Sequence, residues 1–542
     1  MESNAQNTCP MIMANGNPCG RAFRITSERL CIFHSKKHEE KWNVGLLDEF
    51  RKQLQQKIQQ ELADPSIKEL DFTEYVFPAN DFSNLKFNKS VIFSRAIFQQ
   101  NVSFNKTEFT GEKTAFDGAR FEGNTYFGNV EFNSGNNSFI DALFLGDTFF
   151  NRGTVFSGNL TSFGALNTGT IFNGKKTVFT DVFFRSAITS FIKAKFNSSE
   201  ETNFDGTEFH GKVIDFSYSE FRSENVTFRK TKFISDKEDI NFQNCWFKGL
   251  RTLFHDTTFR SNIVCFNDSV FDNNLDFRTS EQNNTQHMFD QGASLRRVIF
   301  LTPERVTFSH LVLTMVEFLG TDLRKINFVS VYWRPMKRFK WAKSGKLKPM
   351  LYSGTYDENL LSKKTPSPNE IELLKTEYRQ LKQNYDENSD YTVADQFYVG
   401  EMEVTRQHNT PWYWKLFSWR RLYHFVSGYG TLPNRSLFIL CFTLITFSAI
   451  YMFTGLKVNA DFAGNIYYIK YELACSLPNL STTLKDFLYC AWFGISGILP
   501  IKDSSQVFEP FTWTRVIQIL ETITVPILTA FFALALRRRF KR

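Results

Sequence analysis

The sequence predicts a mainly β protein: a β-solenoid, followed by a helical linker and an α-helical transmembrane region that resembles a pore domain. Two observations carry this prediction. Phe accounts for 61 of the 542 residues, and these rings recur at a short period between residues 67 and 333. Long apolar runs then lie between residues 436 and 542. A chain of this length is too long for one ordinary core, so we expect several domains.

The Phe period is the main evidence for the solenoid. Steps of five residues alternate with steps of six to nine, and most Phe residues follow a small or β-branched residue by two positions. A helix would repeat its apolar face at three and four residues, and Gly, Asn, Asp and Lys occur between the rings at the density of turns. A fixed short period over more than about 250 residues predicts a solenoid. One stretch shows it with Phe109, Phe116, Phe121, Phe127 and Phe132.

Strand geometry then assigns a direction to each position. Phe points into the coil, the residue two positions earlier points the same way, and the residue directly before Phe points outward. Coils stacked about 4.8 Å apart would form columns of Phe rings. The expected inward set includes Thr107, Thr114, Ala119, Thr125 and Val130, and the outward set includes Glu108, Arg120, Glu131, Lys195 and Glu208.

This repeat resembles that of the pentapeptide-repeat proteins, in a variant centred on Phe. The resemblance implies a right-handed quadrilateral β-helix with four five-residue faces in each coil. Inserted residues, as in 110–113 and 199–202, should bulge at every second corner. Some proteins of this type mimic DNA, but acidic and basic residues nearly cancel in this repeat. We therefore expect neither mimicry nor binding of nucleic acid.

A Cys/His cluster precedes the repeats. Cys9, Cys19, Cys31 and His34 are ligand types that hold structural Zn²⁺, and the intervening Gly and Pro suit tight turns. His38 could replace His34, and unrelated Cys in a flexible arm is the alternative. A segment this short has too little core to fold alone, so a metal would supply folding energy. The scattered Cys and the polar N-terminus predict a reducing compartment and no secretory signal.

Helical patterns flank the repeats. Apolar residues from Trp42 to Leu62 recur at helical spacing and predict a helix that caps the solenoid or forms an oligomer contact. After residue 368, Asn369 with Glu372 suggests an N-cap pair. Two helices should follow, either packed antiparallel or forming a coiled-coil contact between subunits. The segment 378–406 also resembles one that follows the repeats in bacterial membrane-bound pentapeptide-repeat proteins.

Aromatic and basic residues then predict contact with a lipid bilayer. Trp and Tyr prefer the headgroup level, where Lys and Arg meet anionic lipid. Apolar spans are expected at about 437–456 and 516–536, with a shorter re-entrant segment at about 486–500. Arg clusters outside both spans place the N- and C-termini in the cytoplasm of a multi-pass protein. The expected anchors are Trp412, Trp414, Trp419, Arg420, Arg421, Arg537, Arg538 and Arg539.

The order span, short helix, Gly-containing loop and span resembles the two-helix pore module of tetrameric cation channels. The filter signature of potassium channels is missing, so the resemblance does not imply potassium selectivity. Glu521 could line a pore, pair with Arg515 or lie near the membrane surface. Gly494, Ser496, Gly497 and Glu521 are the pore-lining candidates. The closing segment also resembles that of bacterial pentapeptide-repeat proteins with a channel-like end, which implies the inner membrane.

Six segments follow from these patterns: a zinc knuckle (1–38), a capping helix (39–66), the β-helix (67–333), a helical linker (334–411), an interfacial helix (412–435) and a channel-like domain (436–542). The sequence contains no Gly-rich phosphate loop and no acid–base cluster, so we do not expect an enzyme. We expect a β-helix that binds a protein partner and is coupled to an oligomeric pore, a tetramer if it conducts. The alternative is a non-conducting, membrane-anchored scaffold.

Overall fold

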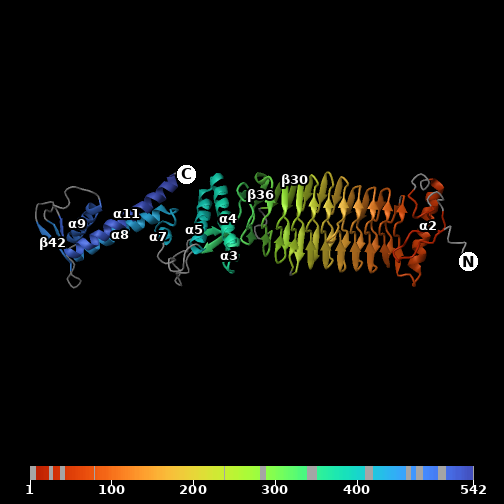
Figure 1. The fold of residues 1–542 in the computed structure, drawn as a ribbon, viewed down its shortest axis with the longest axis horizontal. Helices are drawn as coiled ribbons and strands as arrows, with labels where there is room; N and C mark the ends of the chain where they lie inside the picture. The colour runs from red at the N-terminus through yellow and green to blue at the C-terminus, as the bar shows by residue number, and fades with distance from the viewer. Residues whose placement is uncertain are drawn as a thin grey trace. The chain divides into compact units, whose positions relative to one another are not determined.

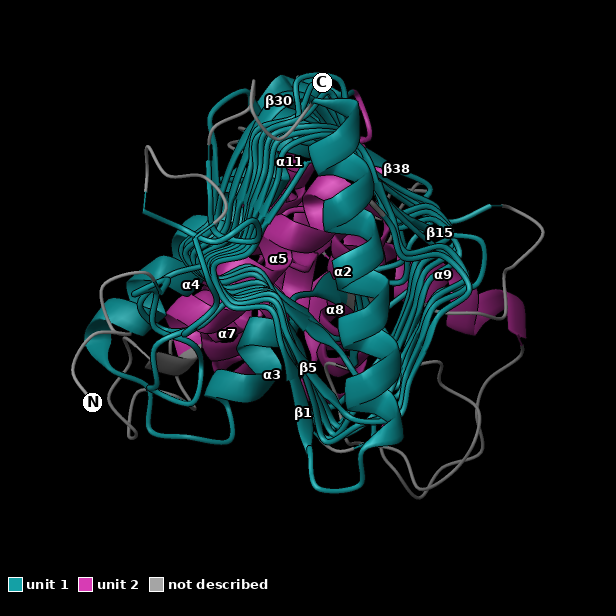
Figure 2. Cartoon of the chain, turned by 90° about the vertical axis from the view of Figure 1, so that its right-hand side faces the viewer, with its two compact units in different colours: residues 1–388 teal, residues 389–542 magenta. Residues whose placement is uncertain are grey.

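The chain forms two compact units, Met1–Asn388 and Ser389–Arg542 (Figure 2). The computed structural model describes residues 8–23, 29–36, 43–78, 80–236, 238–280, 288–337, 351–408, 419–458, 466–471, 480–498 and 508–540.

The first unit is a four-sided parallel β-solenoid of about 10 turns (Figure 1), as the Phe period predicts. Four short strands joined by corners make one coil. The fifth strand, β5 (Ser90–Ile92), begins the second coil and pairs in parallel with the first strand. The first coil contains β1 (Glu69–Asp71), β2 (Val76–Phe77), β3 (Asn80–Asp81) and β4 (Lys86–Phe87).

Equivalent strands of successive coils form the walls. The first strands make an 11-stranded sheet, the fourth strands an 8-stranded sheet, and the second and third strands share a 19-stranded sheet. The shared sheet arises because β30 (Trp246–His255) and β33 (Val270–Arg278) each run through the corner between two walls. Phe98, Phe121 and Phe144 pair in register, so the coil repeats after 23 residues here.

The Phe rings form four buried columns along the solenoid. In one column, the ring centroids of Phe98 and Phe121 lie 4.6 Å apart at an interplanar angle of 3°. Phe121 and Phe144 lie 4.4 Å apart at 4°. These distances follow from the strand spacing of about 4.8 Å, because each ring stacks on the ring one coil away.

The inward and outward positions are those that strand alternation predicts. The inward Thr107, Thr114, Ala119, Thr125 and Val130 are completely buried. The hydroxyl of Thr107 donates to the carbonyl of Phe82 at 2.7 Å, which satisfies a polar group inside the core. The outward positions hold exposed or half-buried charges, some of which pair between coils.

Tight and extended corners alternate around each coil, which matches the expectation of inserted residues at every second corner. The five-residue steps contain a residue in the left-handed region two positions after Phe, such as Asn84 (φ 61°), Lys106 (φ 58°) and Asn129 (φ 58°). Asn tolerates this conformation better than most residues. The longer steps lie at the two remaining corners.

Helices and a short knuckle cover both ends of the solenoid. At the N-terminal end, Phe50 of α2 (Val44–Ala63) packs its ring 6.1 Å from that of Phe77 in the first coil. At the other end lie α3 (Tyr356–Leu361) and α4 (Pro368–Glu387). The Asn384 amide of α4 donates to the carbonyls of Leu323 (2.8 Å) and Ile326 (2.7 Å). These bonds satisfy backbone groups of the last coil that would otherwise be unpaired.

The expected N-cap of α4 is wrong by two residues. Ser367 is the N-cap: its hydroxyl accepts from the Glu370 amide at 3.3 Å, and the Glu370 carboxylate accepts from the Ser367 amide at 2.9 Å. Pro368 occupies the first helical position, where its missing N–H costs nothing. The capping box is therefore Ser367–Glu370, because Pro368 favours the start of the helix immediately after Ser367.

The second unit is mainly helical. Thr514, at the start of its last helix, donates to Thr454, at the end of its first long apolar helix, at 3.0 Å, so these two helices run antiparallel. A three-stranded antiparallel sheet lies at the end where they meet. The elements are α5 (Tyr391–His408), α7 (Trp419–Ser427), α8 (Pro433–Thr454), β41 (Leu456–Val458), β42 (Tyr467–Ile469), α9 (Leu480–Ile498), β43 (Phe508–Pro510) and α11 (Thr512–Phe540).

Candidate functional sites: a metal centre and a buried carboxylate

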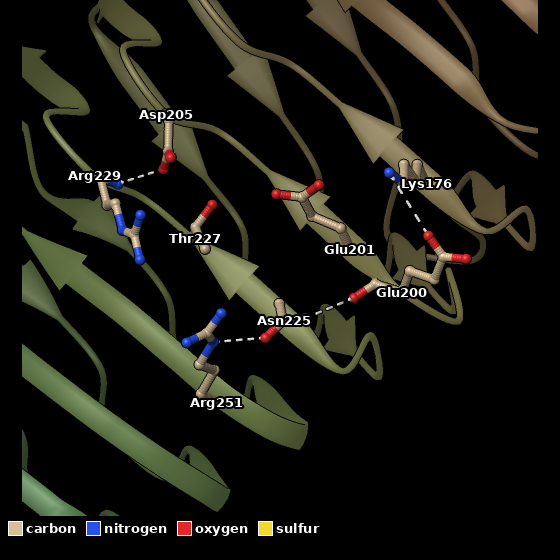
Figure 3. A pocket seen from close by; sticks show the side chains of 8 residues that line it. All are labelled: Lys176, Glu200, Glu201, Asp205, Asn225, Thr227, Arg229 and Arg251. Carbon is tan, nitrogen blue, oxygen red and sulfur yellow. Dashed lines mark hydrogen bonds and ion pairs between the residues drawn. The ribbon is translucent and has the colours of Figure 1, made fainter.

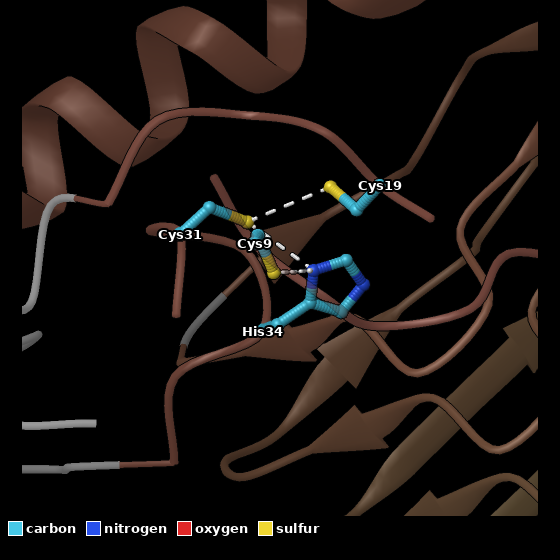
Figure 4. A group of neighbouring side chains, drawn as sticks. All are labelled: Cys9, Cys19, Cys31 and His34. Carbon is cyan, nitrogen blue, oxygen red and sulfur yellow. Dashed lines mark hydrogen bonds between the residues drawn. The ribbon is translucent and has the colours of Figure 1, made fainter. Parts of the chain in front are cut away.

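The predicted metal ligands lie together at the N-terminal end of the first unit. One ligand atom from each of Cys9, Cys19, Cys31 and His34 lies within 4.8 Å of the others (Figure 4). The Nδ1 atom of His34 is 3.4 Å from Cys9 Sγ and 3.2 Å from Cys31 Sγ. Zn–S bonds of about 2.3 Å place two sulfurs of a tetrahedral site about 3.8 Å apart. The sulfurs of Cys19 and Cys31 are 3.9 Å apart, so this donor set fits Zn²⁺.

Local backbone structure explains why these residues meet. A small hairpin with bridges Thr8–Ala22 and Ile12–Pro18 presents Cys9 and Cys19. Its turns use Gly16 (φ 78°) and Gly20 (φ 66°), a backbone region that glycine adopts without strain. A tight turn, in which the His34 amide donates to the Cys31 carbonyl at 3.1 Å, brings the other two ligands together.

A hydrogen bond on the far side of the imidazole orients His34. Its Nε2 atom lies 3.2 Å from the carbonyl oxygen of Thr73, so Nε2 carries the proton and Nδ1 is left to bind a metal. Hydrogen bonds with Cys19 and then Cys31 lower the pKa of the Cys9 thiol, whereas hydrogen bonds with Cys19 and then Cys9 raise the pKa of the Cys31 thiol. Zinc would therefore have to displace the proton that Cys31 retains. His38, the alternative ligand, lies outside the described residues.

The metal centre is part of the solenoid's end. The amide of Val76 in the first coil donates to the Phe33 carbonyl at 2.7 Å, just as Ile97 in the second coil donates to Tyr75 at 2.8 Å. The Phe33 ring also stacks on Tyr75 at 4.7 Å. The turn that carries Cys31 and His34 therefore takes the place of a coil before the first one.

Two helices of the second unit, α8 and α11, are long and apolar enough to cross a membrane. Large apolar side chains point away from the unit, including Phe438 (69% exposed), Phe442 (61%) and Ile519 (62%). Together with the solenoid, these helices fit a membrane-anchored repeat protein. In the structure, α11 extends beyond the expected span 516–536 at both ends, whereas α8 begins before residue 437 and ends two residues before residue 456.

Glu521 lies inside the second unit, where three helices meet. Its side chain in α11 is 2% exposed, and its carboxylate accepts a hydrogen bond from the Tyr451 hydroxyl of α8. On the α9 side, a Cβ at Gly494 would lie 2.7 Å from a Glu521 oxygen. The partner is therefore Tyr451 rather than Arg515, and the backbone of α9 comes close to the carboxylate.

The remaining pore-lining candidates lie in a helix. Gly494, Ser496 and Gly497 belong to the last turns of α9, so the Gly-containing loop expected there is wrong for residues 494–498. A selectivity filter is an extended loop whose backbone carbonyls point at the ions, and residues 494–498 are helical instead. A Cβ at Gly497 would lie 2.6 Å from the Gln518 amide, so both glycines permit close packing on α11. Leu499 and Pro500 lie outside the described residues.

The expected membrane anchors divide into two groups. Trp419, Arg420 and Arg421 at the start of α7 are exposed, as are Arg537 and Arg539 near the end of α11. The ring of Tyr423 in α7 stacks 5.3 Å from that of Phe531 in α11, which brings these basic segments to the same end of the helix pair.

Arg538 makes contacts within the protein. Its guanidinium forms an ion pair with Asp395 at 2.9 Å and lies 3.6 Å above the Tyr398 ring. Trp412 and Trp414 lie outside the described residues.

A buried acidic cluster at the far end of the solenoid has no signal in the sequence. Asp357 and Glu358 of α3 and Glu377 of α4 are each less than a tenth exposed. Burial raises the pKa of Asp357 to about 7, and burial together with the Asp357 charge raises that of Glu377 well above its ordinary value. These acids come together only because α3 and α4 fold over the last coil.

Comparisons with protein-family models, curated proteins and solved structures found no match.

Proposed function

We propose that this chain is a multi-pass membrane protein whose second unit is a channel-like module and whose β-helix is a cytoplasmic binding domain. The observation that carries the proposal is the arrangement of α9, which packs against both α8 and α11. A core of Tyr451, Tyr489, Cys490, Phe493 and Phe508 joins the helices and the small sheet. α9 has 19 residues and begins six residues before the re-entrant segment expected at 486–500. A helix held between two antiparallel spans is the layout of a two-helix pore module.

Charge supports the orientation of this module. The basic ends of α7 and α11 lie at one end of the helix pair, and the three-stranded sheet lies at the other. The positive-inside rule places the basic end in the cytoplasm. The resemblance of segment 378–406 and of the closing segment to bacterial membrane-bound pentapeptide-repeat proteins supports a bacterial inner membrane. The Cys9, Cys19, Cys31 and His34 cluster supports a structural Zn²⁺ in the N-terminal knuckle.

A pore would require several copies of the chain. The outward apolar side chains of α8, α9 and α11, including Leu488 (60% exposed) and Trp492 (51%), offer surface for lipid and for neighbouring copies. Four copies is the number used by the two-helix pore modules that this order resembles. In the proposed mechanism, a protein partner binds the β-helix, and the linker helices transmit that event to the membrane module. No enzymatic step is involved.

A second candidate is a non-conducting anchor for a β-helix scaffold. The hydrogen bond from Tyr451 favours it, because this bond gives the Glu521 carboxylate a structural role without a pore. The close packing of Gly494 and Gly497 on α11 likewise needs no conduction.

Ion flux through liposomes that contain the purified full-length chain separates the two candidates. The measurement includes Glu521→Gln, the matched control Glu509→Gln and the mass of the protein in detergent. Glu509 is an exposed acid of β43 paired with Lys457. Flux from a tetramer that changes in Glu521→Gln but not in Glu509→Gln is the result expected of a pore. A monomer or dimer without flux in any tested salt would reject the channel and support the anchor.

A further inference from the structure

A polar hollow of about 250 Å³ opens on the outer wall of the β-helix (Figure 3). It lies where β19 (Lys176–Val178), β23 (Glu201–Asn203), β27 (Asn225–Thr227) and β30 run side by side. Three cationic and three acidic side chains line it, so the two kinds of charge balance. The acidic side chains, however, have hydrogen-bond or ion-pair partners, whereas the two arginines have unused N–H donors within the described residues.

All three acidic side chains have partners. The Glu200 carboxylate lies 3.7 Å from the Lys176 ammonium, and Glu201 accepts from the Asn203 amide at 2.8 Å. Asp205 accepts from the backbone N–H of Arg229 at 2.8 Å. These contacts use one cation, Lys176, and leave both arginine side chains of the hollow without a carboxylate.

The two arginines retain free donors. Within the described residues, the Arg229 guanidinium makes no hydrogen bond or ion pair, and Arg251 uses only Nε, which donates to Asn225 at 2.6 Å. Thr227 projects between the two arginines in Figure 3. It is 5% exposed, and its hydroxyl also makes no hydrogen bond there. Both guanidinium groups thus have unused N–H donors at one hollow, next to a Thr227 hydroxyl that makes no hydrogen bond within the described residues.

The strand register positions Arg251 at the hollow. The register of β30 with β33 shifts between Lys248 and Arg251, as in a β-bulge. Gly249 permits this shift, because its φ is 158° and a Cβ there would lie 2.0 Å from the Ser223 carbonyl oxygen. Against the preceding coil, β30 keeps the same register on both sides of this point, with Phe247 opposite Phe221 and Arg251 opposite Asn225. The regular stacking of the coils therefore sets Arg251 on the rim of the hollow, and the irregularity affects only the next coil.

We propose that this hollow binds the oxyanion group of a small ligand, a carboxylate or a phosphate, between Arg229 and Arg251. A guanidinium presents paired N–H donors that match such an oxyanion, and two of them fix its position. Glu201 and Asp205 nearby would repel a highly charged anion, which favours a ligand whose oxyanion carries little excess charge. The proposal is independent of whether the second unit conducts ions.

The test measures binding to the full-length chain in detergent by calorimetry. Inorganic phosphate and acetate are titrated separately, with chloride holding the ionic strength constant. We expect saturable binding and slower amide hydrogen exchange in β27 and β30. Arg229→Gln/Arg251→Gln should weaken the affinity at least about tenfold. The control Arg260→Gln removes an exposed charge from β31 (Thr258–Arg260) on a different sheet, and it should bind as the wild type does.

The outcomes separate the two sources of the oxyanion. Binding of phosphate alone identifies a phosphorylated ligand, binding of acetate alone identifies a carboxylate, and binding of both identifies a general oxyanion site. The absence of saturable binding of either ion would overturn the proposal. An equal loss in Arg260→Gln would overturn it too, because general charge would then explain the effect. Amide protection in the Phe columns verifies that each variant is folded, and Arg229→Gln alone replaces the double variant if that protection is lost.

Discussion

Single residues take their roles from the group that faces them. Gly494 and Gly497 resemble filter glycines in the sequence, but each gives α9 room beside a polar side chain of α11. Glu521 resembles a pore acid, but its carboxylate accepts from the Tyr451 hydroxyl. An acid in an apolar helix is costly unless a partner or water satisfies it, and Tyr451 is such a partner.

The metal centre gives the first prediction at this scale. Cys31→Ser removes one thiolate of the proposed zinc site, so bound zinc should fall from about one ion per chain to less than about a tenth of that. The midpoint of thermal unfolding should fall by several degrees, because the knuckle has little core of its own. Metal analysis of the purified protein and circular dichroism measure the two effects.

A matched cysteine controls for loss of a thiol. Cys441 of α8 is exposed and lies outside the cluster, so Cys441→Ser should retain the zinc. A chelator should destabilise the wild type and leave Cys31→Ser unchanged. Equal zinc content in the wild type and Cys31→Ser would reject the site.

At the two ends of the solenoid, elements outside the repeats cover the apolar core and pair backbone groups of the terminal coils. Before the first coil, the Phe33 carbonyl accepts a backbone hydrogen bond as a further coil would. After the last coil, the Asn384 amide of α4 donates to a backbone carbonyl. Trp333 of the last coil donates through Nε1 to the Tyr385 hydroxyl of α4 at 2.7 Å. Solenoids need such ends, because an open coil exposes both its apolar core and its unpaired backbone groups.

The buried acidic cluster of Asp357, Glu358 and Glu377 predicts that the stability of the C-terminal end of the solenoid depends on pH. Glu377 is 2% exposed, and its carboxyl oxygens make no hydrogen bond within the described residues. Thr355 and Asp357 lie beside it, with Glu358, Glu317 and Arg296 also close. Because folding raises the pKa values of Glu377 and Asp357, the folded state binds more protons, and stability falls as pH rises. The loss begins near the ordinary carboxyl pKa of about 4 and continues through the Asp357 value of about 7 and beyond.

Glu377→Gln should remove much of this dependence, because an amide stays neutral at every pH. Between pH 5 and 8, the wild type should lose thermal stability, and the variant should show less than about half of that loss. Hydrogen exchange of the α4 amides localises the effect. Glu387→Gln, an exposed acid at the end of the same helix, should behave as the wild type does. A wild-type stability that rises over this range would contradict the prediction.

At the scale of the whole molecule, the β-helix gains stability mainly from contacts between neighbouring coils. Phe191 stacks on Phe163 (4.6 Å) in one coil and on Phe216 (4.7 Å) in the next. Most contacts within the columns join adjacent coils in this way. A defect should therefore weaken its own coil and the two beside it before it affects the ends.

Phe191→Ala tests this expectation. Loss of a completely buried ring should cost about 3–5 kcal/mol, because it leaves a cavity in the column. Hydrogen exchange should accelerate most in the coils that contain Phe163, Phe191 and Phe216, and least in the first and last coils. Phe149→Ala is the control, since this ring points outward and contacts mainly Tyr126 at 5.4 Å. Uniform acceleration along the whole β-helix would reject the nearest-neighbour description.

Features that depend on local order could be predicted from the amino-acid sequence. Strand side chains alternate with a period of two, so the position of each Phe predicted its own inward direction and that of the residue two positions earlier. Ligand chemistry predicted the quartet of Cys9, Cys19, Cys31 and His34. Length and apolar composition predicted the two long helices, because these properties belong to one continuous segment.

Contacts between residues far apart in the chain depend on how the folded elements pack. Tyr451 and Glu521 are joined by the packing of α8 on α11, and Glu377 is buried because α4 closes the last coil. The hollow brings Arg229 and Arg251 together across neighbouring strands. Coils differ in length, with 24 residues from Glu201 to Asn225 and 26 from Asn225 to Arg251, so the spacing in the sequence alone does not fix that register. Such contacts depend on how complete elements pack, and a linear pattern of residue types carries no record of that packing.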